Sequence, residues 1–398
     1  MPAKRTDQGE KGHLSAQKLV AATLSAWERE GSAGVSGRSL AAVAGLPMSA
    51  IYYHFGDLER LLETAQTEAR AEAGVWIRAQ LDAIGSEVKG PAALGPLLAA
   101  VVDDWCETRR TLAFARREGQ LMALRDERHV AACAKWDALW QGFWQEICDR
   151  LEISDLGTAT AWVFDGLCGL HILRWRRPVD RAALSELADG WARWARGLPA
   201  EGSAWFEQAR RDATALILPP PPEDDTANAI AAAAATTVAK RGVTGLTHRA
   251  VAAEAGLTLG VVSYKFRTSA DLLKAAFDAV YRRTAPSPDS QPPPPSPPVF
   301  GVPDRENLLG MEELLVAAAR DPDLQAFAAQ LHYMRGGSAG RFMQQLLGEH
   351  APMTSLDNVV ASALMGGRVR AYLCGGRAHD PDPPHGDFGP LLARFARR

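Results

Sequence analysis

Two short segments of the chain combine aromatic, hydroxyl and basic side chains in a way that suits contact with DNA. One reads PMSAIYYH over residues 47–54, and the other reads TLGVVSYK over residues 258–265. Tyr, Ser, Thr and Lys side chains can bind backbone phosphates, whereas Met and Leu can pack on a thymine methyl group. The major groove is wide enough to admit a helix. We therefore expect each segment to form a short helix that contacts DNA.

The residues before each segment predict a preceding helix and a tight turn. Ser36 can cap a helix that runs to about residue 44, Gly45 supplies the turn, and the next helix begins near Pro47. This arrangement is a helix-turn-helix, which places its second helix in the major groove. The apolar side chains expected to hold the two helices together are Leu40, Val43, Leu46, Ile51 and Phe55 in the first case and Val251, Ala255, Leu257, Val262 and Phe266 in the second.

An internal repeat duplicates this unit. Residues 31–62 align without a gap with residues 242–273, at an offset of 211, and 12 of the 32 positions are identical. The segments upstream, residues 14–29 and 226–241, both have helical character. The N-caps expected for these two upstream helices are Ser15 and Thr226.

The two repeats resemble a known family in the strings AGLPMSAIYYHFGDLERLL and AGLTLGVVSYKFRTSADLL. Both are similar to the signature of the TetR family of bacterial transcriptional regulators, over about 50 residues in each repeat. The resemblance implies a three-helix DNA-binding unit followed by a helical ligand-binding and dimerisation domain, present twice. The family's common recognition-helix tyrosine is present as Tyr52 but is replaced by Ser263. Leu58 and Ser269 stand where the family often has a lysine.

Local charge must supply any DNA affinity, because the whole chain has a net charge of −3. Residues 1–62 carry seven basic and six acidic residues, whereas residues 226–283 carry eight and three, so the second repeat is the more basic. The residues expected to contact DNA are Ser36, Arg38, Pro47, Met48, Ser49, Tyr52, Tyr53 and His54 in the first repeat and Thr247, Arg249, Thr258, Leu259, Gly260, Ser263, Tyr264, Lys265 and Arg267 in the second.

The remaining sequence predicts an all-α protein, because helical patterns fill it and no convincing strand pattern is present. Proline runs cannot continue a helix and favour an extended chain, so they mark a linker and a loop. The predicted parts are a first helix-turn-helix domain (1–62), a first helical ligand-binding and dimerisation domain (63–217), a proline-rich linker (218–225), a second helix-turn-helix domain (226–273), and a second helical domain (274–398) with a proline-rich loop (285–304).

Two strong helices are predicted near the end of each half, at residues 158–175 and 184–198 and at residues 356–373 and 388–396. Glycines recur in the first of each pair and permit close approach of helices. We expect the two halves to pair through these helices, so that one chain imitates a dimer. Pairing with a second copy, as a homodimer, is the alternative. The glycines are Gly166 and Gly169, then Gly366 and Gly367.

Tryptophan is confined to the first half, where all 11 lie between Trp27 and Trp205. Ligand sites are mostly apolar with a few polar groups, so this distribution predicts a pocket for a small apolar or aromatic effector. The alternative is that the rings fill a core. The residues expected to line the pocket are Trp105, Trp136, Trp140, Trp144, Trp162 and His171.

A ligand-responsive regulator of transcription, acting as a repressor, is the function that these features favour. The two DNA-contacting helices differ, so the double-stranded operator should contain two unlike half-sites. Effector binding would alter the angle or spacing between the two units, provided that the effector prefers one arrangement. The alternative is a protein in which only the first helix-turn-helix binds DNA and the second serves the architecture.

Other classes of function lack support in the sequence. No GxSxG, HExxH, P-loop or glycine-rich dinucleotide motif is present, so we expect neither catalysis nor a cofactor. The five cysteines are scattered and suggest free thiols, with no metal site. No run approaches about 18 apolar residues, and the first residues lack the apolar stretch of a signal peptide. We therefore predict a cytoplasmic protein with no membrane partner.

Overall fold

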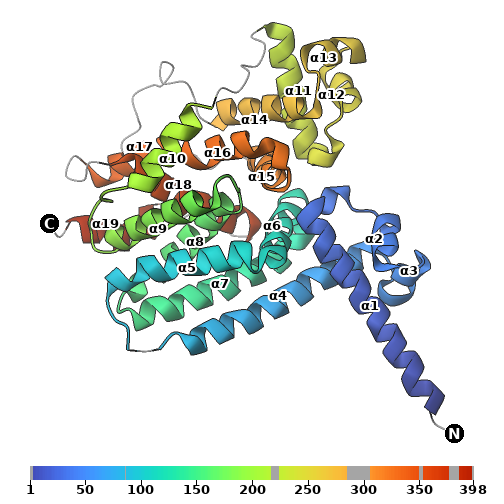
Figure 1. Ribbon diagram of the computed structural model, residues 1–398, viewed down its shortest axis with the longest axis horizontal. Coiled ribbons are helices and arrows are strands. Elements are labelled where there is room, and N and C mark those ends of the chain that lie inside the picture. Colours follow the sequence, from blue (N-terminus) through green and yellow to red (C-terminus); the bar gives the residue numbers. More distant parts are fainter. Residues whose placement is uncertain are drawn as a thin grey trace.

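The computed structural model describes residues 3–85, 87–216, 224–284, 305–348, 353–375 and 385–396. Within these ranges every element is helical and no strand is formed, so the predicted all-α fold is confirmed there (Figure 1). The predicted proline-rich loop lies outside the described residues, as does most of the predicted linker.

The first half of the chain contains ten α-helices among the described residues: α1 (Ala3–Arg29), α2 (Gly37–Ala44), α3 (Ser49–Phe55), α4 (Leu58–Ala83), α5 (Leu94–Glu107), α6 (Arg110–Arg125), α7 (Val130–Arg150), α8 (Gly157–His171), α9 (Arg177–Trp194) and α10 (Ala204–Thr214). The second half contains α11 (Asp225–Arg241), α12 (His248–Ala255), α13 (Leu259–Lys265), α14 (Ser269–Thr284), α15 (Arg305–Arg320), α16 (Gln325–Tyr333), α17 (Gly337–Leu347), α18 (Ser355–Cys374) and α19 (His385–Ala396).

The helix boundaries repeat along the chain as the sequence does. Helices α2 and α12 begin and end 211 residues apart, and so do the 3-10 turns η1 (Ser32–Gly34) and η5 (Val243–Gly245) that precede them. Further along, α6 and α15 correspond at a shorter offset of 195 residues, because the second half is shorter at the place where the first half has α5. Corresponding helices therefore follow in the same order in both halves.

Local sequence signals set the ends of α2 and α12. Ser36 caps α2 by accepting a hydrogen bond of 3.1 Å from the backbone N–H of Ser39, as predicted, and Thr247 caps α12 in the same way. Gly45 and Gly256 end these helices in the left-handed conformation, both with φ of 66°, which glycine adopts without steric cost. These features produce the predicted short helix, tight turn and second short helix in both halves.

The two N-caps predicted upstream are wrong. Ser15 lies inside α1, because this helix begins at Ala3 and continues through residue 15. Asp224, and not Thr226, caps α11, since its carboxylate accepts a hydrogen bond of 2.8 Å from the N–H of Ala227. Aspartate is as good a cap as threonine or better, so the earlier residue begins the helix.

Helices α8 and α18 form the central contact between the two halves (Figure 1). Gly166 of α8 lies against the backbone of Ala363, and Gly367 of α18 lies against the backbone of Trp162, so a Cβ atom on either glycine would overlap the facing helix. The contacts are reciprocal, because both the glycines and the residues that they meet are 201 positions apart. The close approach predicted from the glycines is confirmed at Gly166 and Gly367, within one chain. It is wrong at Gly169 and Gly366, where an added Cβ atom would meet the side chains of Arg117 and Arg370 and not the backbone of the facing helix.

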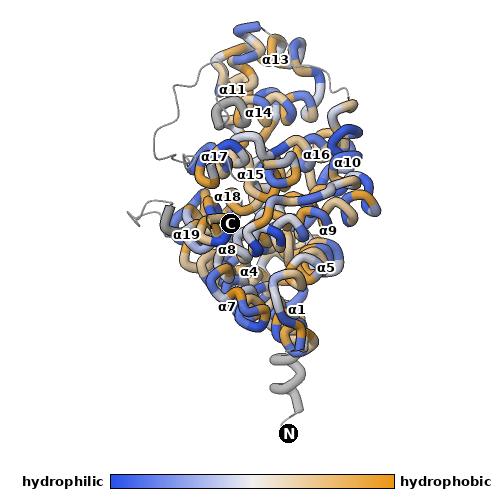
Figure 2. The backbone as a smooth tube through the Cα atoms, turned by 90° about the vertical axis from the view of Figure 1, so that its left-hand side faces the viewer, coloured by the Kyte–Doolittle hydropathy of each residue, from blue (hydrophilic) through white to orange (hydrophobic). Residues whose placement is uncertain are grey.

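The first helix pair, α2 and α3, and the second helix pair, α12 and α13, lie apart from each other at the edge of the molecule (Figure 1). In the view turned by 90°, α13 and α1 lie at opposite ends, with α8, α15 and α18 between them (Figure 2). Over the described ranges, none of the helices has the length and apolar character needed to cross a membrane.

Candidate functional site

The second helix of each pair presents an exposed aromatic face. Tyr53 of α3 is 83% exposed and Tyr264, 211 residues later on α13, is 78% exposed. Each helix packs against the rest of the protein through one buried side chain, which is Ile51 in α3 and Val262 in α13. Apolar surface gathered on one exposed element is typical of an interaction surface. The two helix pairs therefore carry corresponding exposed surfaces.

Most of the residues predicted to contact DNA in the first helix pair are exposed. His54 is half-buried, and its ring packs edge-on against Tyr53 with 4.8 Å between the ring centroids. The Ser36 hydroxyl already accepts the hydrogen bond that caps α2. Only the part of this side chain that faces away from α2 is left for contact with another molecule. The exposed residues are Ser36, Arg38, Pro47, Met48, Ser49, Tyr52 and Tyr53.

The second helix pair differs in its hydrogen bonds and charges. Thr258 caps α13 by accepting from the N–H of Val261, and Lys265 is half-buried in an ion pair with Asp224, the cap of α11. Lys265 therefore reaches a partner only if it leaves Asp224. The remaining predicted residues are exposed: Thr247, Arg249, Thr258, Leu259, Gly260, Ser263, Tyr264 and Arg267.

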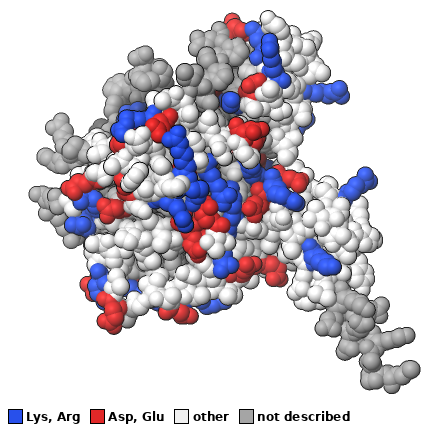
Figure 3. All heavy atoms as spheres, viewed as in Figure 1, with Lys and Arg blue, Asp and Glu red and all other residues white. Residues whose placement is uncertain are grey.

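Three predicted arginines remain available for an anionic partner. Among the described residues, Arg38, Arg249 and Arg267 form no ion pair, and all three are exposed. Arg38 and Arg249 occupy corresponding positions in the first turns of α2 and α12. Figure 3 shows mostly uncharged side chains, with isolated basic ones, on the face of the part that holds α2 and α3. Each pair thus combines a neutral aromatic surface with separate cations.

Reciprocal ion pairs join helix α6 of the first half to helix α15 of the second half. Glu118 of α6 pairs with Arg320 of α15, and Glu313 of α15 pairs with Arg125 of α6. Glu118 corresponds to Glu313, and Arg125 to Arg320, at the offset of 195. Both glutamates are buried, with exposed fractions of 1% and 4%. The contact is therefore of the kind that a two-fold symmetric dimer makes, in which each partner repeats the other's interaction.

The same two glutamates reach the segments that lead into the helix pairs. Glu118 accepts a hydrogen bond of 2.7 Å from the N–H of Ser32 in η1, and Glu313 accepts one of 3.4 Å from the N–H of Val243 in η5. The turns η1 and η5 also contact one another. The position of each helix pair is therefore tied to the contact between the two halves.

Two further arginines extend this reciprocity, and none of these residues was predicted from the sequence. Arg110 at the start of α6 donates to the carbonyl of Ala319, and Arg305 at the start of α15 donates to the carbonyl of Leu124. Donors and acceptors again correspond at the offset of 195. The signal was present in the sequence, because Arg, Glu, Arg and Asp recur with the same spacing in residues 110–126 and 305–321. An alignment of the two halves at the offset of 211 alone does not reveal this recurrence, because its offset is 195.

The residues predicted to line an effector pocket all lie in the buried core. Trp140 packs on Phe164 with 4.1 Å between ring centroids and on Trp105 with 4.8 Å. Two pockets of about 590 Å³ and 440 Å³ have no tryptophan in their linings, and the cavity that Trp140 and Trp162 do line has a volume of only about 10 Å³. The arrangement fits the alternative in which the rings fill a core, and effector binding among them stays a prediction. The buried residues are Trp105, Trp136, Trp140, Trp144, Trp162 and His171.

His171 belongs to a buried polar cluster. Its Nε2 lies 2.9 Å from a carboxylate oxygen of Asp103, which also binds Arg177 and Arg181. Burial lowers the pKa of His171, and the hydrogen bond to Asp103 only partly opposes this effect. Burial would raise the pKa of Asp103, but the hydrogen bonds from His171 and Arg181 outweigh it and hold that pKa below its usual value. These contacts hold the cluster together, although Nδ1 of His171 and one guanidinium nitrogen of Arg177 find no hydrogen-bond partner among the described residues.

His332 of α16 is a second buried histidine, and it makes stability depend on pH. Burial lowers its pKa from 6.5 to about 4, so the folded state keeps it neutral while the unfolded state binds a proton. Stability should therefore fall as the pH drops from 6.5 to about 4. Over this range the wild type should lose roughly 3 kcal/mol more than His332→Gln in urea unfolding. Parallel pH curves for the two proteins would contradict a neutral buried His332.

Comparison with known proteins does not place the chain in a family. No protein-family model matches it, and no curated protein matches it. Among the described residues, no group of three or more His, Cys, Asp and Glu side chains could hold a metal ion. The resemblance of the two repeats to TetR-family sequences therefore remains an expectation drawn from their motifs.

Proposed function

We propose that the protein is a DNA-binding regulator of transcription, a repressor, that uses two unlike helix-turn-helix units of one chain on a single operator. A small effector would release the DNA or alter its binding. The chain would imitate a dimer, with α8 and α18 at the centre of the contact between its halves. The motifs of both repeats, which resemble those of TetR-family regulators, favour this class of function.

One observation carries the proposal most strongly. Two corresponding exposed helix pairs are attached to each other through reciprocal contacts, in which Glu118 and Glu313 each bind the segment entering a helix pair and an arginine of the other half. A contact of this kind fixes two binding surfaces relative to one another. Dimeric DNA-binding proteins need the same property, because half-sites recur at a fixed spacing along the duplex.

The two DNA-contacting helices differ, so the proposed operator is asymmetric. Position 52 is Tyr where position 263 is Ser, and position 54 is His where position 265 is Lys. Side chains of different chemistry select different base edges. Two different half-sites should therefore bind better than either half-site repeated as a palindrome.

DNA selection tests this proposal. The full chain would be used to select binding sequences from a random duplex library, and the selected site would be compared with the two palindromes built from its halves. Each mismatched base pair costs about 1–3 kcal/mol, so the asymmetric site should bind at least tenfold more tightly than either palindrome. A palindrome that binds as well as the selected site would contradict two unlike DNA-contacting surfaces. Failure to select any sequence would contradict specific DNA binding.

A second candidate keeps DNA binding in the first helix pair alone, with the second as an architectural partner. The ion pair between Lys265 and Asp224 favours it, because that contact withdraws the lysine of α13 from an interface. This candidate needs two copies of the chain to bind two half-sites. It therefore predicts that a palindrome of the first half-site is the best ligand.

A further inference from the structure

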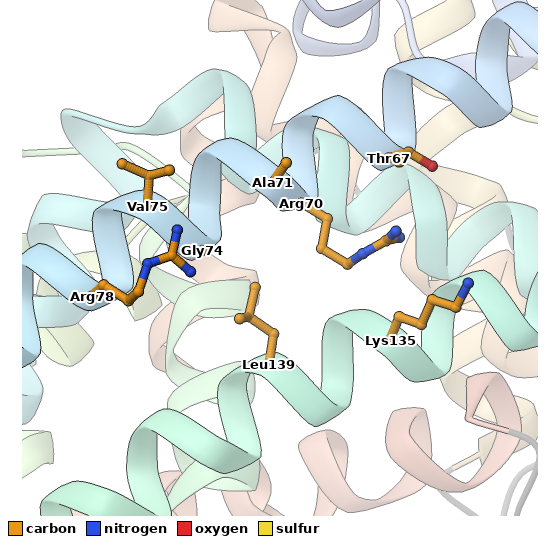
Figure 4. A pocket seen from close by; sticks show the side chains of 8 residues that line it. All are labelled: Thr67, Arg70, Ala71, Gly74, Val75, Arg78, Lys135 and Leu139. Carbon is orange, nitrogen blue, oxygen red and sulfur yellow. The ribbon is translucent and has the colours of Figure 1, made fainter.

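An open groove runs between α4 and α7 on the surface of the first half (Figure 4). Its volume is about 590 Å³, within the range of small-molecule binding sites. Arg70, Gly74 and Arg78 face it from α4, at the four-residue spacing that places side chains on one face of a helix. Lys135 and Leu139 face it from α7 with the same spacing. Two aligned rows of side chains therefore oppose each other across the groove.

Three cations gather in this groove without an acidic partner. Arg70, Arg78 and Lys135 form no ion pair with any described residue, although Asp82 lies one helical turn from Arg78. The side chains of Arg70 and Lys135 point toward one another at one end of the groove (Figure 4). Like charges that converge raise the local positive potential, in a chain whose net charge is −3. An anion placed between them would remove this repulsion.

The part of the groove between its basic ends is apolar. Leu139 projects from α7 between Lys135 and Arg78, facing Gly74 of α4 (Figure 4). A Cβ atom at Gly74 would lie 3.6 Å from the guanidinium of Arg78 and 3.9 Å from Leu139, so the basic end at Arg78 adjoins the apolar side chain of Leu139 here. Ala71 and the backbone at Gly74 complete this stretch. The groove therefore combines an anion-binding end with an apolar channel that leads away from it.

The second pocket of comparable size lacks this combination. Its volume is about 440 Å³ and its lining is apolar except for Arg150. The guanidinium of Arg150 already donates to the carbonyls of Leu81 and Ile84, at 2.8 Å and 2.7 Å. No free cation is left there to bind an anion, so the α4–α7 groove is the better candidate for a charged ligand.

We propose that the α4–α7 groove binds an amphiphilic organic anion, with the anionic group between Arg70 and Lys135 and the apolar body along Leu139. We further assign this ligand as the effector, a statement that rests on the proposed function. Helix α4 begins at Leu58, directly after α3 ends at Phe55, and it packs on both α1 and α3. A ligand that alters the position of α4 therefore acts on the helix that holds the first helix pair.

The site belongs to the first half only. The positions that correspond to Arg70 and Lys135 in the second half are occupied by Tyr281 and Gln330. Neither of these side chains is basic, so a second site of the same chemistry is not expected. One ligand should bind per chain.

Calorimetric titration of the full chain without DNA tests the site. The probes are decanoate, decyl phosphate, decan-1-ol and acetate, which separate the anionic group from the apolar body. Decanoate and decyl phosphate should bind with one site per chain, and the relative strength of the two identifies carboxylate or phosphate as the preferred group. Decan-1-ol and acetate should bind at least tenfold more weakly, since each lacks one of the two interactions. Equal binding of decanoate and decan-1-ol would overturn the proposal.

A pair of charge-matched variants places the ligand. Arg70→Gln/Lys135→Gln should weaken decanoate at least tenfold, because it removes both charge-assisted hydrogen bonds. Arg196→Gln/Arg211→Gln removes two exposed cations outside the groove, and should bind decanoate as the wild type does. Equal far-ultraviolet circular dichroism and thermal midpoints would establish that both variants fold. Unchanged binding by the groove variant would overturn the site.

Addition of decanoate to the protein on its selected DNA tests the effector assignment separately. DNA affinity, followed by fluorescence anisotropy, should change for the wild type and for the Arg196→Gln/Arg211→Gln control but not for the groove variant. Binding of decanoate without any change in DNA affinity would overturn the effector assignment and leave the binding site. A protein that binds decanoate but no DNA would overturn the proposed function, and the calorimetric result would still stand.

Discussion

Replacement of Gly166 or Gly367 by alanine is expected to lower the free energy of unfolding by about 1–3 kcal/mol or more. The new Cβ atom would overlap the backbone of Ala363 or Trp162, and a backbone cannot move aside as a flexible side chain can. Relief therefore requires separation of α8 from α18, which are the central contact between the two halves. Urea unfolding monitored by circular dichroism would measure the change.

Gly142→Ala is the matched control for these variants. Gly142 lies within α7, as Gly166 lies within α8, but no atom is close to the position of its added Cβ. Alanine favours a helix over glycine by roughly 0.5–1 kcal/mol, so this variant should be more stable than the wild type. If Gly166→Ala and Gly367→Ala also stabilised the protein, the close contact of α8 with α18 would be wrong.

Loss of charge at Glu118 or Glu313 should have the second large effect. Glu118→Gln leaves Arg320 without its acidic partner, and weakens the acceptor for the N–H of Ser32. Removal of one partner of a buried ion pair costs about 3–5 kcal/mol, because the other charge stays buried without compensation. Glu313→Gln should lower stability less, since Arg125 is 22% exposed, donates a hydrogen bond to Ser32 and still lies near Glu118. The stability of both variants can be measured by urea unfolding.

Glu59→Gln provides the comparison on the surface. Glu59 pairs with Arg128 at 2.9 Å, but both side chains are largely exposed, at 43% and 68%. Exposed ion pairs contribute about 0–1 kcal/mol, so this variant should change stability little. Similar effects of Glu59→Gln and Glu118→Gln would contradict a structural role for the reciprocal ion pairs.

The sequence predicts the helix pairs well because their signals are local. A cap at Ser36, a left-handed glycine at position 45 and apolar side chains within a few residues determine where α2 ends and α3 follows. The same signals recur at Thr247 and Gly256. Each depends on hydrogen bonds or backbone angles inside one short segment, so no knowledge of distant residues is needed. One predicted member of the apolar set is wrong, because Val43 is 54% exposed.

Elsewhere the predictions fail for two reasons: apolar periodicity does not show every helix start, and it does not show contacts between distant residues. Helix α9 begins at Arg177, seven residues before the predicted start at residue 184, because Pro178 in its first turn favours a helix start that apolar periodicity does not reveal. Helical spacing correctly places Trp136, Trp140 and Trp144 on one side of α7, but it cannot tell a filled core from a pocket. The groove between α4 and α7 is likewise invisible, because its cations come from segments about 60 residues apart in sequence.

The central claim, that two unlike units of one chain bind one operator, is tested most directly by variants of each helix pair on the selected DNA. Tyr52→Ala alters only the first pair, Lys265→Ala/Arg267→Ala alters only the second, and affinity would be measured over a range of salt concentrations. Both variants should weaken binding, and the second should reduce the slope of log affinity against log salt by up to about 2, one for each phosphate that the variant no longer binds. If only Tyr52→Ala weakens binding, or if neither does, the claim that both units bind DNA is contradicted.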